Sequence, residues 1–143
     1  GNVHACAATE AGVICWGANI QLTGTKFAAT SVDELSTGSQ HTCIIAAGAV
    51  DCVGFNNSNQ LNVPTDLISP HSLVSGNAHS CIVDNNAVTC WGDNAQGQSL
   101  VPVLSITPLF LSAGQGHSCA GSPIGIQCWG GENSSSGETD VPK

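Results

Sequence analysis

Short apolar segments alternate with polar, glycine-containing turns along the whole chain, and this alternation repeats four times. Each copy opens with Gly-x-x-His-x-Cys and reaches a second cysteine after eight intervening residues. A turn rich in Asn, Gln, Gly and Ser follows, and a Val-Pro pair or its counterpart then leads into another apolar stretch. The copies span residues 1–37, 38–75, 76–113 and 114–143, so the sequence predicts a single all-β domain of tandem repeats.

The eight residues between the cysteines predict a β-hairpin with a two-residue turn in every copy. The predicted turn residues are Glu10-Ala11, Ala47-Gly48, Asn85-Asn86 and Pro123-Ile124. In such a hairpin the two cysteines form a non-hydrogen-bonded pair with Cα atoms about 4.5 Å apart, which suits a disulfide. The fourfold repetition therefore favours four local bridges, which are Cys6–Cys15, Cys43–Cys52, Cys81–Cys90 and Cys119–Cys128.

Disulfides and charge restrict the location and the partners. Four bridges with loops of this size would contribute on the order of 10 kcal/mol, and they predict a secreted, extracellular protein. Ten acids stand against two bases, which argues against nucleic acid and anionic membrane surfaces as partners. No apolar run approaches the roughly 20 residues of a membrane span. The chain begins at Gly1 instead of Met, which fits either a processed secreted chain or a fragment of a longer one.

The recurrent histidines and tryptophans have a functional and a structural interpretation. His4, His41, His79 and His117 stand two residues before a cysteine, on the same strand face. Their spacing does not match the close ligand pairs of zinc sites, so we expect structural hydrogen bonds to the neighbouring repeat and no metal or cofactor. Trp16, Trp91 and Trp129 follow the second cysteine, where the second copy has Val53. An aliphatic replacement favours packing between repeats, over the disulfides, rather than a sugar-stacking platform.

The remaining candidate sites are weak. No nucleophile–base pair stands out, and the chain has neither tyrosine nor a phosphate-binding loop, so the sequence predicts that the protein is not an enzyme. Asp84 and Asp93 lie outside any calcium-loop pattern and are interpreted as solubilising surface charge. Asn56 and Asn133 begin Asn-x-Ser sequons in the polar turns, which makes them candidate glycosylation sites.

The motifs resemble the repeat of the regulator-of-chromosome-condensation superfamily of β-propellers. The match is most complete in the third copy, at His79, Cys81, Cys90, Trp91, Gly92, Asn94, Gly97 and Gln98. The resemblance covers the whole chain and implies blades of short antiparallel sheets around a central axis. Cysteine-paired versions are similar to secreted bacterial proteins and to the ectodomains of Crinkly-type plant receptor kinases. Closed propellers have roughly 4–8 blades, those of this family about seven, whereas this chain has four repeats.

The incomplete repeat count predicts self-association. The last copy stops at Val141-Pro142-Lys143, before the apolar stretch that follows in other copies, and neither end carries a polar capping repeat. Two unlike ends predict a head-to-tail contact that closes a ring of about eight blades or propagates as a filament, unless the chain belongs to a longer polypeptide. We therefore expect a non-enzymatic extracellular assembly protein, decorated with glycans. The alternative is a secreted binding module, a lectin or protein inhibitor, that uses the propeller loops.

Overall fold

The computed structural model describes residues 1–18, 24–27, 29, 31–131 and 135–142, and within them it contains twelve β-strands and no helix. The strands are β1 (His4–Thr9), β2 (Gly12–Gly17), β3 (Gly24–Phe27), β4 (Glu34–Thr37), β5 (His41–Ala46), β6 (Ala49–Gly54), β7 (Pro70–Ser75), β8 (His79–Asp84), β9 (Ala87–Gly92), β10 (Phe110–Ala113), β11 (His117–Ser122) and β12 (Gly125–Gly130). The described part of the chain therefore has no helix that could cross a membrane.

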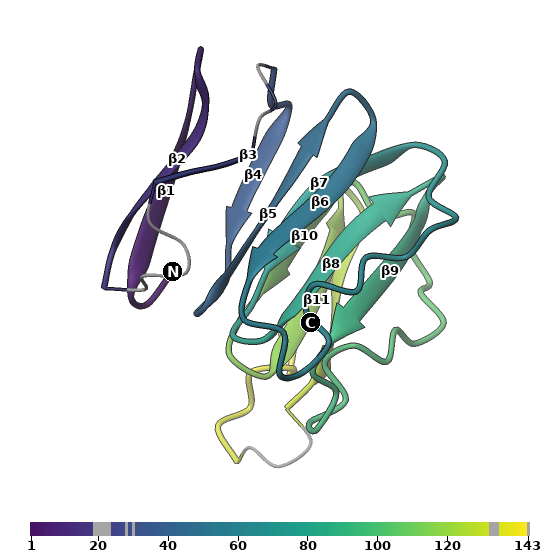
Figure 1. Cartoon of the computed structure of the whole chain (residues 1–143). Coiled ribbons are helices and arrows are strands. Elements are labelled where there is room, and N and C mark those ends of the chain that lie inside the picture. The colour runs from purple at the N-terminus through teal and green to yellow at the C-terminus, as the bar shows by residue number, and fades with distance from the viewer. Residues whose placement is uncertain (19–23, 28, 30, 132–134, 143) are drawn as a thin grey trace.

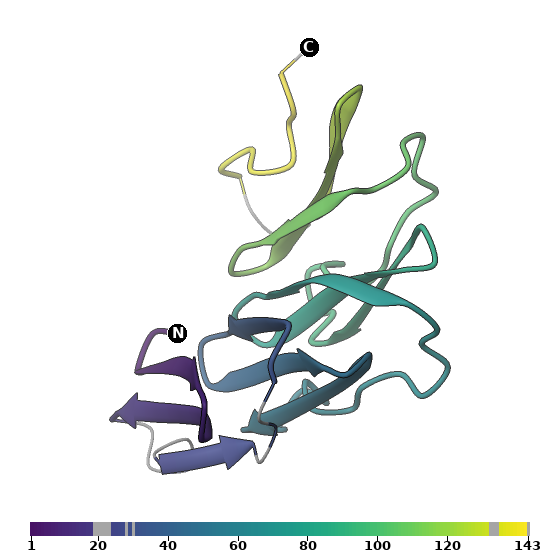
Figure 2. The same ribbon diagram turned by 90° about the horizontal axis from the view of Figure 1, so that it is seen from above.

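Four three-stranded antiparallel sheets follow one another in chain order. We call them blade 1 (β1–β3), blade 2 (β4–β6), blade 3 (β7–β9) and blade 4 (β10–β12). Figure 1 shows the blades side by side. Seen from above in Figure 2, they follow an open arc with blades 1 and 4 at its two ends. The prediction of an all-β fold of tandem, disulfide-stapled, propeller-like hairpins is confirmed, and the described residues form an open arc rather than a closed ring.

The hairpins are β1–β2, β5–β6, β8–β9 and β11–β12, and each turns at the two residues that the cysteine spacing indicates. Asn85 and Asn86 have φ of 48° and 66°, the left-handed conformations that a type I′ turn requires. The paired cysteines lie directly opposite one another, with Cα atoms 4.0–4.1 Å apart. The structure joins them as Cys6–Cys15, Cys43–Cys52, Cys81–Cys90 and Cys119–Cys128.

The third strand of a blade comes from a place that the repeat pattern does not reveal. In blades 2, 3 and 4 it precedes the hairpin and pairs with the hairpin's first strand. In blade 1 the third strand, β3, follows the hairpin and pairs with β2. Among the described residues, no strand pairs with the other edge of β1. The apolar stretch that ends each of the first three sequence repeats therefore belongs to the sheet of the next repeat.

Hydrophobic residues gather between blades. One cluster joins Val13 and Phe27 of blade 1 to Ile44 of blade 2. The next joins Ile45 of blade 2 to Ile82 of blade 3, and a third lies between blades 3 and 4. A three-stranded sheet this small cannot bury both of its faces alone, so each blade is stabilised by its neighbours.

Candidate functional site

Every blade has two chemically different faces, because side chains alternate along a strand. The face that carries the histidine and the disulfide points to the following blade, and we call it the forward face. The face that carries the residue after the histidine and the residue after the second cysteine points to the preceding blade, and we call it the rear face. Contacts between a forward and a rear face recur three times in the chain.

A histidine–hydroxyl hydrogen bond crosses each of these interfaces. The hydroxyl residue stands directly after the histidine of the next repeat, so the bond links equivalent positions in neighbouring blades. The Nε2–Oγ pairs are His4–Thr42 at 2.7 Å, His41–Ser80 at 2.9 Å and His79–Ser118 at 2.9 Å. The same hydroxyl oxygens lie 3.4, 3.6 and 3.5 Å from the sulfurs of Cys6, Cys43 and Cys81.

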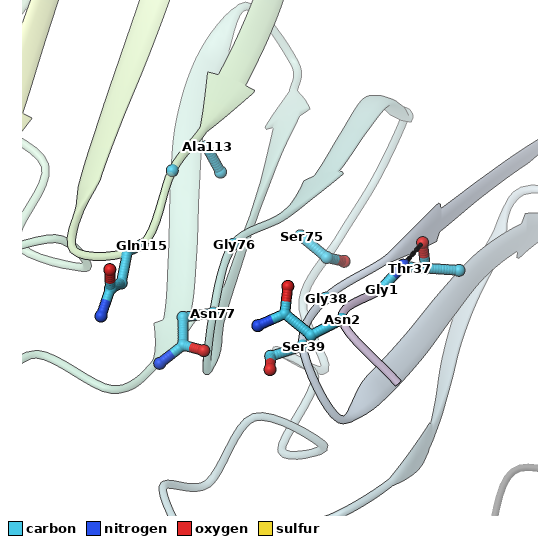
Figure 3. Close-up of a pocket in the computed structure, with 11 residues that line it drawn as sticks. Gly1, Asn2, Thr37, Gly38, Ser39, Ser75, Gly76, Asn77, Ala113 and Gln115 are labelled. Carbon is cyan, nitrogen blue, oxygen red and sulfur yellow. Dashed lines mark hydrogen bonds between the residues drawn. The ribbon is translucent and has the colours of Figure 1, made fainter. Parts of the chain in front are cut away.

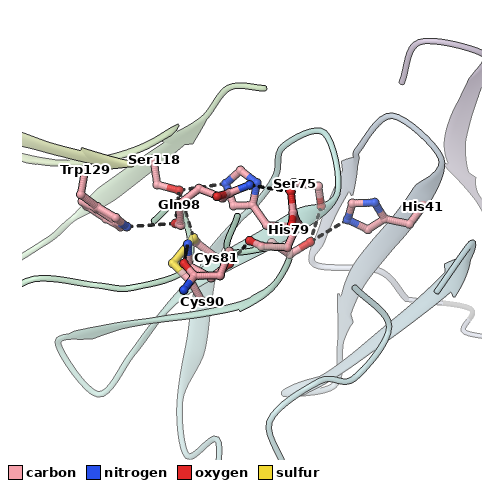
Figure 4. The surroundings of a disulfide bond; sticks show 12 residues. His41, Ser75, His79, Cys81, Cys90, Gln98, Ser118 and Trp129 are labelled. Carbon is pink, nitrogen blue, oxygen red and sulfur yellow. Dashed lines mark hydrogen bonds between the residues drawn. A yellow bond between two sulfur atoms is a disulfide. The ribbon is translucent and has the colours of Figure 1, made fainter. Parts of the chain in front are cut away.

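At the interface between blades 3 and 4 (Figure 4), the hydrogen bonds determine which nitrogen of His79 carries the proton. Ser118 donates its hydroxyl proton to the carbonyl oxygen of Gln98 at 3.0 Å. Nε2 of His79 must therefore be protonated and donate to Ser118. Trp129 also donates its indole N–H to the Gln98 carbonyl, at 3.0 Å. Gln98 thus joins the polar loop of blade 3 to two rear-face residues of blade 4.

Burial keeps these histidines neutral. Loss of hydration, with a smaller contribution from neighbouring histidines of the row, lowers the pKa of both His41 and His79 to about 4. For His79 the nearby Asp93 acts in the opposite direction. Burial, followed by the N-terminal charge, lowers the pKa of His4 as well. The Nδ1 atoms of these three histidines are buried without a hydrogen-bond partner. The hydrogen bond from each imidazole to the next blade is therefore made through Nε2.

The glycine of each Gly-x-x-His opening makes room for this histidine. A Cβ built on Gly76 would collide with the imidazole of His79 and with the carbonyl oxygen of Gly114 in the next repeat. Gly38 stands in the same relation to His41 and Gly76. Any side chain at this position would push the histidine away or separate two blades.

Two of the three tryptophans lie between blades, and the third does not. Trp91 and Trp129 are 7% and 6% exposed and pack against the disulfide of the preceding blade. Trp91 donates its indole N–H to the carbonyl oxygen of Gln60 at 3.0 Å. Trp16 is 54% exposed, so the expected packing between repeats is not seen for this residue within the described chain. Trp16 lies on the rear face of blade 1, which no other sheet covers among the described residues.

The polar loops use their asparagines and aspartates to close local turns. Asn56 is exposed, accepts the backbone N–H of Leu61 at 2.9 Å and donates Nδ2 to Asn62 at 3.1 Å. Asn133, the other sequon residue, lies outside the described residues. Asp84 accepts the backbone N–H groups of Ile68 and Ser69, at 2.9 and 2.6 Å.

Asp93, too, has a structural partner, because it accepts a bond from Gln98 at 2.8 Å. Interpreting Asp84 and Asp93 as surface charge alone is therefore incomplete. No group of three histidine, cysteine or acidic residues in the described part of the chain is arranged to hold a metal ion.

The forward face of blade 4 forms an apolar groove of about 330 Å³. Phe110, Ile126 and the Cys119–Cys128 disulfide line it, and Val141 and Pro142 close one side. Phe110 and Ile126 are half-exposed.

The turn beside the groove repeats the hydrogen bonds of the internal loops. Asp140 N–H donates to the Gly137 carbonyl at 3.0 Å, as Leu100 donates to Gly97 at 3.1 Å. The forward face of blade 4 therefore has the same kind of surface that blades 2 and 3 use to contact the next blade.

The rear face of blade 1 is also apolar. Ala5 lies opposite Trp16, and Ala7 lies opposite Ile14 in the β1–β2 hairpin. Ile14 is 39% exposed, and Ala7 is exposed. The two ends of the arc thus present unlike apolar faces.

A polar pocket of about 470 Å³ runs along the edge where the blades converge (Figure 3). Each repeat contributes a glycine and the polar residue after it, as in Gly38-Ser39, Gly76-Asn77 and Gly114-Gln115. Backbone bonds from Ser39 to Asn77 and from Asn77 to Gly114 hold the row together, at 3.1 and 3.2 Å. Amides and hydroxyls in such a pocket suit binding of a neutral polar group, and they provide no general base or nucleophile pair.

Comparison with known proteins shows the fold. No protein-family model matches the chain, and neither does any curated protein sequence. Among solved structures, it is similar to the receptor kinase CR4 ectodomain of Physcomitrella patens, with 24% identity and a TM-score of 0.76, over 98% of this chain and 41% of that one. The Crinkly WD40 ectodomain of the Arabidopsis thaliana receptor kinase ACR4 gives 22% identity and a TM-score of 0.71, over 90% and 53%.

The third similar structure is Prp20p of Saccharomyces cerevisiae, the yeast RCC1, with 19% identity and a TM-score of 0.77. The match covers 99% of this chain and 44% of Prp20p. The chain therefore spans about half the length, or less, of the structures it resembles. Its fold is that of RCC1-like β-propeller blades.

Proposed function

We propose that this chain, an arc of RCC1-like propeller blades, is a non-enzymatic extracellular structural protein that assembles through its two end faces. The observation that carries the proposal is the pair of unlike apolar faces, the groove on blade 4 and the rear face of blade 1. Unlike faces make a head-to-tail contact, which closes into a ring or propagates as a filament. Two four-bladed arcs would provide about eight blades, within the roughly 4–8 of closed propellers.

Two observations support the extracellular location. Four disulfides staple the four hairpins, and no cysteine is free. Such bonds persist in oxidising compartments. Two of the similar structures are receptor-kinase ectodomains. Glycans on Asn56 would lie on an exposed loop that follows β6, and glycopeptide mass spectrometry tests whether they are present.

The mass in solution tests the assembly. Multi-angle light scattering and negative-stain imaging of the native, unreduced chain should show species of at least two chains, as rings or fibres. A single species of 14.4 kDa at all accessible concentrations would overturn the proposal.

The polar pocket favours a second candidate function, a secreted binding module. The pocket has no titratable side chain, and its amides and hydroxyls match the hydrogen-bonding groups of a neutral saccharide. A glycan array probed with the labelled protein tests this candidate. Binding that is lost in an Asn77→Ala variant would support it, and the absence of any bound glycan would exclude a lectin of this type.

A further inference from the structure

We infer that the assembly joint is a fourth blade interface, in which the rear face of blade 1 from a second copy, centred on Trp16, fills the groove on blade 4. The inference rests on the proposed assembly and specifies its contact surfaces. It also specifies how the joint differs chemically from the three interfaces inside the chain, namely by the absence of the histidine–hydroxyl bond.

The groove on blade 4 has the same composition as the filled grooves inside the chain. Its disulfide, Cys119–Cys128, corresponds to Cys43–Cys52 of blade 2, and Ile126 corresponds to Val50. In blade 2 this surface is covered by Ile82 and Trp91 from the rear face of blade 3. The blade 4 groove therefore requires an aliphatic residue and a tryptophan from its occupant.

The rear face of blade 1 provides both. Trp16 occupies the strand position of Trp91 and Trp129, and Ala7 occupies the position of Ile82 and Ala120. Alanine with tryptophan is the combination that blade 4 itself uses to fill the groove of blade 3, where Ala120 is fully buried. A second copy thus offers a face whose fit to this kind of groove is already seen within the chain. The surface is continuous with an established interface.

Two residues distinguish the joint from the internal interfaces. Ala5 stands where the internal rear faces have the hydroxyl residues Thr42, Ser80 and Ser118. In the joint, His117 of one copy therefore faces the methyl group of Ala5.

Ile14 is the second of these residues. Its position on the rear face is held by polar residues in the other blades, as by Thr89 in blade 3 and Gln127 in blade 4. The joint is consequently more apolar than the internal interfaces and lacks the histidine–hydroxyl hydrogen bond that recurs in all three of them.

Restoring the missing hydroxyl tests the inference. Ala5→Thr places an Oγ where His117 of a second copy can donate, whereas Ala5→Val adds the same volume without a hydroxyl. Because a hydrogen bond contributes about 1 kcal/mol, we expect Ala5→Thr to tighten self-association about fivefold relative to Ala5→Val, as measured by sedimentation equilibrium. The gain should disappear when His117→Phe is added.

Trp16→Gln should weaken self-association at least about tenfold, because it removes the largest side chain of the joint. Trp16 is exposed in the single chain, so at concentrations where both proteins are monomeric this variant should keep the thermal unfolding profile of the wild type.

The outcomes separate this inference from the proposed function. A multimer whose association constant is unchanged in the Trp16 and Ala5 variants would overturn the joint and leave assembly standing. A monomeric wild type whose Ala5→Thr variant associates while Ala5→Val does not would support the matching faces and overturn the proposed function. Monomers in every variant would overturn both.

Discussion

At the scale of single residues, the Gly-x-x-His opening is a pair of mutually dependent positions. The imidazole of His79 occupies the space that a side chain on Gly76 would need, and the carbonyl of Gly114 closes that space from the next blade. The glycine is thus required for steric reasons, because its backbone is not among those with positive φ.

Gly76→Ala should lower the free energy of unfolding by about 1–3 kcal/mol, the usual cost of an extra methyl group in a filled interior. Denaturant unfolding with the disulfides intact measures the change. Gly125→Ala is the matched control, because its Cβ would meet only Ile106, at 3.9 Å. Equal losses in the two variants would contradict the steric explanation.

Sequence reasoning located the repeated positions of the site but missed their exceptions. The hairpins, the turn residues and the inter-repeat role expected of the histidines follow from spacing that occurs four times. The exposure of Trp16 does not, because the Cys-Trp-Gly motif is the same whether or not another blade covers the tryptophan. The hydroxyl position after the histidine was missed as well, although the series Ala5, Thr42, Ser80 and Ser118 carries the signal.

At the scale of elements, each sheet is held to the next one by side-chain contacts between the two blades. Trp91 buries its ring on the disulfide of blade 2 and donates to a loop carbonyl of that blade. The sequence did not predict where the third strand pairs, because β4, β7 and β10 lie in the preceding repeat. Short apolar stretches do not reveal their pairing partner, which tertiary packing decides.

Trp91→Phe should cost about 1–3 kcal/mol, since it leaves a gap and removes a donor from a buried carbonyl. Trp16→Phe, in the same motif, should cost less than about 0.5 kcal/mol because its ring is exposed. Urea unfolding of monomeric samples compares the two variants. A larger loss for Trp16→Phe would contradict the described packing.

At the scale of the whole molecule, a row of neutral histidines runs through all three internal interfaces. In the unfolded chain a histidine has a pKa of about 6.5, whereas burial lowers the pKa of His41 and His79 to about 4. As pH falls below about 6.5, the unfolded chain therefore takes up protons that the folded chain does not.

The free energy of unfolding should consequently be level above pH 6.5 and fall between pH 6.5 and about 4. Each of the two histidines should account for a loss on the order of 3 kcal/mol across this window. Urea unfolding at several pH values measures the slope, and His79→Gln should reduce it by about 1.4 kcal/mol per pH unit. The comparison with this variant separates histidine titration from that of carboxylates, and an unchanged slope would contradict the prediction.

The displacement of the repeats relative to the blades has a consequence for how such a chain changes length. Each internal repeat contains the hairpin of one blade and, at its C-terminal end, the first strand of the next blade. Consecutive sheets are therefore covalently connected within a single repeat. Duplicating one internal copy in frame therefore adds one blade, one interface between blades and one covalent connection between sheets. The new interface would use the same residue types as the existing ones. This architecture can therefore gain or lose whole repeats by duplication or deletion of the corresponding gene segment, without disturbing the sheets on either side.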